Sequence, residues 1–104
     1  NRFCANIHHA GVQDVVTPWR MRSVDAARHM PFPVDFVYVD GAHEYADARD
    51  DLRAWWPLVR AGGLIAGDDY HPDFPGVIRA WDEFAGEQQQ ELKNVSGLVY
   101  LEKR

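Results

Sequence analysis

The stretch from Asp35 to Tyr70 constrains the fold more than any other part of this sequence, because it holds two strand-like runs joined by one amphipathic segment. The runs are Phe36 to Val39 and Leu64 to Ala66, and both are apolar without alternation. Such runs are typical of strands buried in a parallel sheet with helices above and below. Between them, apolar residues recur at the three- and four-residue steps of one helix face: Tyr45, Ala48, Leu52, Trp55, Trp56 and Val59. The stretch therefore predicts a βαβ unit.

Breaker residues set the expected limits of this unit. Pro57 should make the last turn of the central helix irregular, because proline removes a backbone donor. Residues 61–63, Ala-Gly-Gly, should then turn the chain into the second strand. Upstream, we expect a helix that ends at Gly11, a β-prone run over 12–17, and a helix that Ser23 caps and that runs to about Met30.

The part after the unit is predicted to close the sheet. Residues 70–76 are rich in breakers and form a loop long enough to cover a site. A helix follows with its inward face formed by Val77, Ala80, Trp81 and Phe84. Two short β-prone runs around Ser96-Gly97 predict a hairpin. We therefore expect an α/β, Rossmann-like domain with a mostly parallel sheet and a C-terminal antiparallel hairpin.

Charge and composition limit the classes of partner. The chain has 104 residues, enough for one domain, and its formal net charge of -5 argues against nucleic acid or an anionic membrane as the main partner. Cys4 is the single cysteine, so no internal disulfide can form, which fits a cytoplasmic protein. No apolar run reaches the roughly 20 residues of a membrane span. A small-molecule ligand is the expected partner.

Acidic residues follow both strands of the predicted unit. Asp40 closes the first strand, and Asp68 and Asp69 close the second. Because ligands collect outside the carboxyl ends of parallel strands, we expect the three carboxylates to converge. Carboxylates held that close take up protons or bind a cation, and they suit Mg²⁺ or another hard divalent ion. His43, in the turn after the first strand, could reach a metal-bound hydroxyl as general base.

Each of these residues also has an ordinary structural interpretation. Asp40 could be the N-cap of the next helix, and the Asp68-Asp69 pair could serve only its own turn. His43 taken alone is a surface residue at the start of a helix. The coincidence of two neighbouring strands that both end in acid, with a histidine in the first turn, favours the metal site.

Four segments of the chain carry a family resemblance: Val-Asp-Gly-Ala-His-Glu-Tyr (39–45), Asp-Leu-Arg-Ala-Trp-Trp-Pro-Leu (51–58), Gly-Gly-Leu-Ile-Ala-Gly-Asp-Asp-Tyr (62–70) and Pro-Gly-Val-Ile-Arg-Ala-Trp-Asp-Glu-Phe (75–84). Together they resemble class I S-adenosylmethionine-dependent methyltransferases. The most similar group is the metal-dependent O-methyltransferases that modify sugars of macrolide antibiotics. The resemblance extends over nearly the whole chain.

The resemblance implies roles for six residues. Asp40, Asp68 and Asp69 match the metal-binding acids of the family, and His43 matches the position of its general base. The same comparison implies that Ser23, Val24 and Asp40 border S-adenosylmethionine. The implied reaction is transfer of the sulfonium methyl to a hydroxyl that Mg²⁺, or another divalent cation, orients and that His43 deprotonates.

The sequence departs from the family pattern near its beginning. The glycine-rich turn after the first family strand and the acid after the second are both absent from residues 1–104. We therefore expect residues 1–104 to form the C-terminal portion of a methyltransferase domain that lacks the first two strands and is inactive by itself. The strand at 36–39 would then have an unpaired edge, which invites pairing with another copy of the chain.

These observations favour an O-methyltransferase that acts on a hydroxyl of a small molecule, such as a sugar. Two alternatives stay open at this point. Acids with a histidine also suit a metal-dependent hydrolase or a hydroxylase-like enzyme, since both activate metal-bound water. A non-catalytic α/β fragment, in which the acids serve turns and caps, is the third interpretation.

Overall fold

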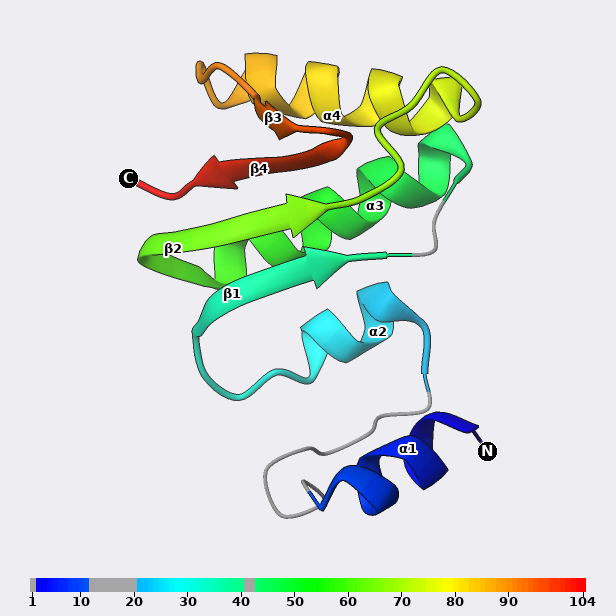
Figure 1. The fold of residues 1–104 in the computed structure, drawn as a ribbon. Helices are drawn as coiled ribbons and strands as arrows, with labels where there is room; N and C mark the ends of the chain where they lie inside the picture. The colour runs from blue at the N-terminus through cyan, green and yellow to red at the C-terminus, as the bar shows by residue number, and fades with distance from the viewer. Residues whose placement is uncertain (1, 12–20, 41–42) are drawn as a thin grey trace.

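A computed structural model describes residues 2–11, 21–40 and 43–104, and the predicted β-prone run at 12–17 lies outside these residues. Figure 1 shows the order of the elements along the chain. The helices and strands are α1 (Arg2–Ala10), α2 (Ser23–Arg28), β1 (Val34–Val39), α3 (Tyr45–Trp55), the 3-10 helix η1 (Trp56–Leu58), β2 (Val59–Gly67), α4 (Pro75–Glu87), β3 (Lys93–Val95) and β4 (Leu98–Glu102).

The described strands form one sheet in the order β1-β2-β4-β3. β1 and β2 are parallel and are joined through α3, so the predicted βαβ unit is confirmed. β4 is antiparallel to both β2 and β3, which confirms the C-terminal hairpin. Its turn holds Ser96 at φ 52° and Gly97 at φ 91°, the two positive values of a type I′ turn. The α/β fold class is therefore confirmed.

The passage from α3 into β2 differs in part from the prediction. α3 ends at Trp55, and Pro57 lies in η1, so the expected irregular turn is present. The predicted turn before the second strand is wrong, because β2 already begins at Val59. The pairing jumps from Val34 with Val59 to Phe36 with Leu64, and the extra residues of β2 form a bulge.

A glycine is required within this bulge. A Cβ atom added to Gly63 would lie 2.5 Å from the carbonyl oxygen of Asp35 and 2.9 Å from that of Arg60. Gly62 has φ +87°, a conformation that L side chains rarely adopt. The glycines thus permit a close approach of two backbones inside the strand, rather than a turn ahead of it.

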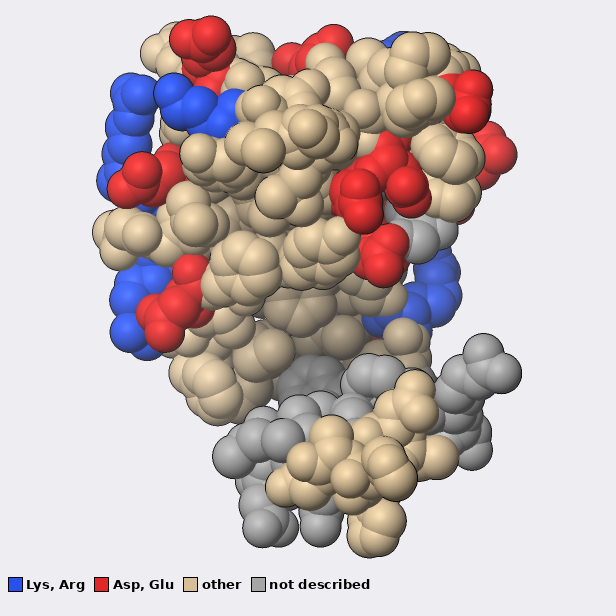
Figure 2. Space-filling model, in the orientation of Figure 1, with Lys and Arg blue, Asp and Glu red and all other residues tan. Residues whose placement is uncertain are grey.

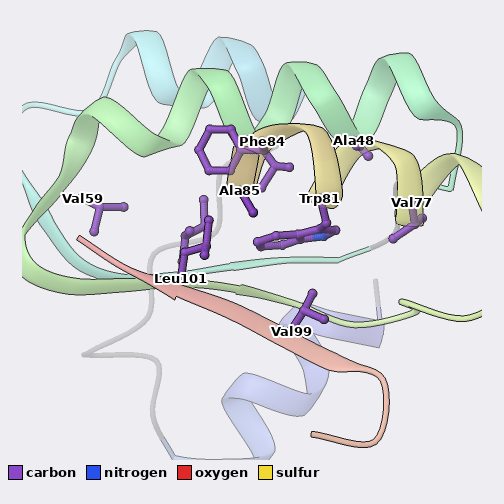
Figure 3. Close-up of a cluster of buried hydrophobic side chains, with 11 residues drawn as sticks. Ala48, Val59, Val77, Trp81, Phe84, Ala85, Val99 and Leu101 are labelled. Atoms are coloured by element: carbon purple, nitrogen blue, oxygen red, sulfur yellow. The ribbon is translucent and has the colours of Figure 1, made fainter. Parts of the chain in front are cut away.

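The hydrophobic core lies between one face of the sheet and the helices α3 and α4 (Figure 3). Its fully buried large side chains come from α3, β2, α4 and β4: Leu52, Ile65, Trp81, Val99 and Leu101. The predicted inward residues of α4, which are Val77, Ala80, Trp81 and Phe84, are all buried. Trp81 also contacts the sheet, since a Cβ atom on Gly67 would lie 2.7 Å from its ring.

The other face of the sheet is open within the described part of the chain. Phe36 is 54% exposed and Tyr38 is 45% exposed, although both were predicted to be buried beneath helices. That prediction is wrong for these residues because α3 and α4 both pack on the opposite face, and in Figure 1 α3 lies behind β1 and β2. Figure 2 shows a largely uncharged surface over the strands in the same view.

The prediction for α2 is correct in position but wrong in its limits. The helix ends at Arg28 rather than Met30, its N-cap residue is Arg22, and no side chain caps it. The Ser23 hydroxyl instead accepts a hydrogen bond of 2.7 Å from the indole Nε1 of Trp55. This bond connects α2 to α3. None of the helices in the described residues is long and apolar enough to span a membrane.

Candidate functional site

The carboxyl ends of β1 and β2 lie side by side. Val39 pairs with Gly67, so Asp40 and Asp68 each follow directly after a paired residue. The N-cap of α3 is Glu44, and no side chain caps this helix. The interpretation of Asp40 as a helix cap is therefore wrong. Figure 2 shows acidic side chains gathered on the side toward which the arrows of β1 and β2 point in Figure 1.

Asp68 and Asp69 contact different parts of the fold. One carboxylate oxygen of Asp68 accepts a hydrogen bond of 3.2 Å from the hydroxyl of Tyr38, and the other accepts one of 2.7 Å from the backbone N–H of Asp69. The hydrogen bond between Asp68 and the backbone N–H of Asp69 is the contact expected if the pair serves its own turn. Asp69 has φ 63°, in the left-handed region that non-glycine residues seldom adopt. Such backbone strain recurs at functional sites.

Tyr38 lies among the three acidic residues, and the sequence analysis did not identify it. Partial burial raises the pKa of its phenol, and the hydrogen bond to Asp68 and the charges of Asp68, Asp40 and Asp69 raise it further. The alternation of side chains along β1 could have indicated this residue, because positions 38 and 40 face the same side of a strand. Its hydroxyl is a further polar group at the site.

His43 is held on two sides, although its side chain is 45% exposed. Its Nε2 atom lies 2.8 Å from a carboxylate oxygen of Asp69. Its ring stacks on Phe74 with centroids 4.2 Å apart and an angle of 23° between the planes. The interpretation of His43 as an ordinary surface residue does not account for these contacts. Phe74 is a second residue that the sequence analysis missed, and only its place between Pro72 and Pro75 marked it.

The three residues predicted to border the cofactor line one cavity. Ser23, Val24 and Asp40 surround a space of about 410 Å³, together with Arg22, Asp47, Asp50 and Asp51. Burial raises the pKa of Asp51, and a hydrogen bond from Ser23 opposes that effect. A second cavity of about 320 Å³ along β1 shares Ser23, Asp40 and Asp51 and adds Trp55 and Tyr38. The fold therefore brings α2, β1 and α3 together around this space.

The residue types at this site suit a divalent cation, but the described side chains do not surround a common point where one could bind. Carboxylate oxygens are the ligands that hard cations prefer. Within residues 2–11, 21–40 and 43–104, however, no three His, Cys, Asp or Glu side chains come close enough together to hold a metal ion. The expected convergence of three carboxylates is absent because Asp68 turns to Tyr38 and Asp69 turns to His43.

Solved structures with similar folds include three methylases. A protein from Clostridium thermocellum described as an rRNA methylase aligns with a TM-score of 0.78 at 17% identity, over 96% of this chain and 64% of that protein. CalS11, a TDP-rhamnose 3'-O-methyltransferase of calicheamicin biosynthesis, aligns with a TM-score of 0.61 at 21% identity, over 80% of this chain and 37% of its own. MycE from the mycinamycin pathway, solved with Mg and SAH, aligns with a TM-score of 0.58 at 25% identity, over 78% of this chain and 28% of MycE.

Sequence comparison points to the same family. The uncharacterized protein R132 of Acanthamoeba polyphaga mimivirus is 31% identical over 70 residues, which are 62% of this chain and 30% of that protein. The chain thus spans less than two thirds of each of these relatives. The model of a methyltransferase domain matches residues 1–70. The resemblance to class I methyltransferases is confirmed, and the chain belongs to the methyltransferase-domain family.

Proposed function

We propose that this chain contributes part of the active site of an S-adenosylmethionine-dependent, divalent-metal-assisted O-methyltransferase. The acceptor is a hydroxyl group of a small molecule, such as a sugar. One observation carries the proposal: at the carboxyl ends of β1 and β2, His43 pairs with Asp69 at 2.8 Å, beside Asp40 and Asp68. Family membership supports methyl transfer, and the likeness to MycE, solved with Mg and SAH, supports the metal.

His43 is the general base in this proposal. An ionised carboxylate only accepts hydrogen bonds, so the Nε2 atom that faces Asp69 carries the proton and Nδ1 carries the free lone pair. Nδ1 takes the proton of the acceptor hydroxyl while the hydroxyl oxygen attacks the methyl carbon. Asp69 fixes this tautomer and stabilises the imidazolium that forms. Bound S-adenosylmethionine would supply the electrophilic methyl group, with its carbon–sulfur bond breaking and S-adenosylhomocysteine as the leaving group.

In this proposal the binding of a cation would bring together Asp40, Asp68 and Asp69, whose carboxylates do not converge in the described part of the chain. We take this cation to be Mg²⁺ or another divalent ion. Asp69 has one carboxylate oxygen on His43, which leaves its other oxygen for such an ion. Asp68 would keep the hydrogen bond that it accepts from the hydroxyl of Tyr38. This hydroxyl would then lie next to the ligands of the metal. A divalent cation at this place would orient the acceptor hydroxyl and lower its pKa.

The cavity lined by Ser23, Val24 and Asp40 is the proposed contact region for the cofactor. It adjoins the carboxyl end of β1, where ligands of open α/β sheets bind. Its many acidic side chains suit a ligand that carries positive charge, as the sulfonium and amino groups of S-adenosylmethionine do.

The net charge of -5 favours a small hydroxylated acceptor over a nucleic acid or a membrane. β1 is an edge of the described sheet, and we propose that this edge can pair with another copy of the chain. A cytoplasmic location stays a prediction.

Methyl transfer from labelled S-adenosylmethionine to a panel of sugars, measured with Mg²⁺ on the full-length protein that contains residues 1–104, tests the proposed function. His43→Gln should lower kcat by about 100-fold or more, because general acid–base catalysis typically supplies that much. His9→Gln is the matched control, since His9 is exposed on α1. Equal turnover in His43→Gln and in the parent protein would exclude the base. Release of a hydrolysed product without methyl transfer would favour the metal-dependent hydrolase instead.

A further inference from the structure

We propose that Phe74 is a positioning residue for His43, through which α4 fixes the orientation of the imidazole. The inference deepens the proposed function and rests on the assignment of His43 as general base. Phe74 has no direct part in the reaction. Its contribution is to hold one ring face of the base, while Asp69 holds one ring nitrogen.

The stack itself is close and nearly parallel. The ring centroids of His43 and Phe74 are 4.2 Å apart, and their planes differ by 23°. A planar contact on the ring face restricts tilting of the imidazole, whereas the 2.8 Å bond from Nε2 to Asp69 restricts its rotation in the ring plane. The two contacts together limit where the second nitrogen, Nδ1, can lie.

Phe74 is anchored to a rigid element. It is the N-cap residue of α4, and its carbonyl oxygen accepts hydrogen bonds from the backbone N–H groups of Val77 and Ile78 at 3.0 and 3.3 Å. Its own N–H donates to the carbonyl oxygen of His71 at 2.8 Å. α4 is fixed in turn by its buried side chains, among them Trp81 and Phe84. The position of the Phe74 ring therefore follows the position of α4.

Three further contacts hold the backbone near His43 against the same helix. A Cβ atom on Gly76 would lie 2.7 Å from the backbone nitrogen of Tyr45 and 3.0 Å from the carbonyl oxygen of His43. The hydroxyl of Tyr45 donates a hydrogen bond of 2.7 Å to Glu83. The guanidinium of Arg79 lies 3.9 Å from the centroid of the Tyr45 ring.

The backbone and the side chain of His43 are thus both positioned by α4. The segment from Asp68 to Phe74 links the end of β2 to α4. Near its two ends, Asp69 supplies the carboxylate and Phe74 supplies the aromatic ring that contact His43. Catalytic groups work best when neighbouring packing fixes their orientation. A loss of the Phe74 ring should therefore disturb the chemical step more than cofactor binding.

The first test measures the geometry without any substrate. Proton NMR of the full chain should show the His43 ring protons shifted upfield by the ring current of Phe74. Phe74→Leu should remove this shift, and Phe74→Tyr should retain it. Phe32→Leu is the control, because Phe32 is 63% exposed and lies outside the site. Absence of the upfield shift in the parent protein would overturn the proposal whatever its activity, and so would a shift unchanged in Phe74→Leu.

The second test measures the consequence in the enzyme. Phe74→Leu should lower kcat by about 10- to 100-fold, because small misplacements of a catalytic group have effects of that size. The KM for S-adenosylmethionine should stay unchanged, and Phe74→Tyr should restore kcat. A rise in KM alone, or a loss of kcat that Phe74→Tyr does not restore, would overturn the positioning role. If the full-length parent protein that contains residues 1–104 transfers no methyl group, the proposed function fails, and the NMR result still decides whether Phe74 stacks on His43.

Discussion

The hydrogen bond between Tyr70 and Asp82 is expected to make the stability of the protein fall as pH rises through the alkaline range. The Tyr70 hydroxyl donates to a carboxylate oxygen of Asp82 at 2.6 Å. This bond ties the residue after Asp69 to α4, and the backbone N–H of Tyr70 also donates to the carbonyl oxygen of Gly97 at 3.3 Å. The bond raises the pKa of Tyr70 to about 12, with partial burial and the charge of Asp82 as further causes.

The magnitude follows from that shift. A rise from 10.0 to about 12 corresponds to at most about 2.7 kcal/mol between the neutral and ionised forms. Asp82 is exposed, so solvent screens the interaction, and about 1 kcal/mol is the expected contribution to the free energy of unfolding. Tyr70→Phe should therefore destabilise the protein by about 1 kcal/mol at neutral pH.

The direction with pH follows from the same shift. A tyrosine whose pKa is higher in the folded state stabilises the protein fully below its unfolded pKa of about 10, and it loses this contribution as pH rises through the folded value of about 12. The difference in stability between the parent protein and Tyr70→Phe should therefore be constant up to about pH 9 and shrink between about pH 10 and pH 12.

Urea unfolding at a series of pH values measures this difference. Both proteins contain the same other titrating groups, so their effects cancel in the comparison. Tyr100→Phe is the control, because the hydroxyl of Tyr100 makes none of the hydrogen bonds found among the described residues. A Tyr70→Phe difference that is absent at neutral pH, or that stays constant up to about pH 12, would refute the reasoning.

Three further variants test the core, the bulge and the metal site. Leu52→Ala should destabilise the protein by about 3 kcal/mol in urea unfolding, because Leu52 is fully buried, and a cost below about 1 kcal/mol would contradict the described core. Gly63→Ala should destabilise by about 1 to 3 kcal/mol through its backbone clash, whereas Gly86→Ala, with open space around it, should not destabilise. Asp68→Asn should weaken Mg²⁺ binding in calorimetry by about 10-fold or more, with exposed Asp73→Asn as control, and an equal affinity would remove Asp68 from the metal site.

The elements that could be predicted are those whose signal is local. The apolar runs, the helix spacing and the Ser96-Gly97 turn each lie within a few neighbouring residues, so the βαβ unit and the hairpin were predicted correctly. The start of β2 was not, because Val59 fits both the helix stripe and a strand. Its place in β2 is decided by pairing with Val34, which is distant in the sequence.

At the site, too, features with a local signal could be predicted, whereas contacts between residues distant in sequence could not. The acids after the two strands were found because they follow recognisable apolar runs, and the parallel register does bring Asp40 and Asp68 to neighbouring ends. The partners of these side chains are distant in sequence: Tyr38 with Asp68, His43 with Asp69, and Ser23 with Trp55. No local pattern distinguishes a carboxylate that faces a metal from one that faces a tyrosine or a histidine. The degree of convergence therefore could not be predicted.

The central claim is that the carboxyl ends of β1 and β2 form the site of methyl transfer. Anomalous diffraction at the manganese edge, from crystals grown with Mn²⁺ and S-adenosylhomocysteine, tests it most directly. We expect one manganese peak in contact with Asp40, Asp68 and Asp69, with S-adenosylhomocysteine against Ser23 and Val24. A manganese peak remote from all three carboxylates, with S-adenosylhomocysteine bound away from β1, would contradict it.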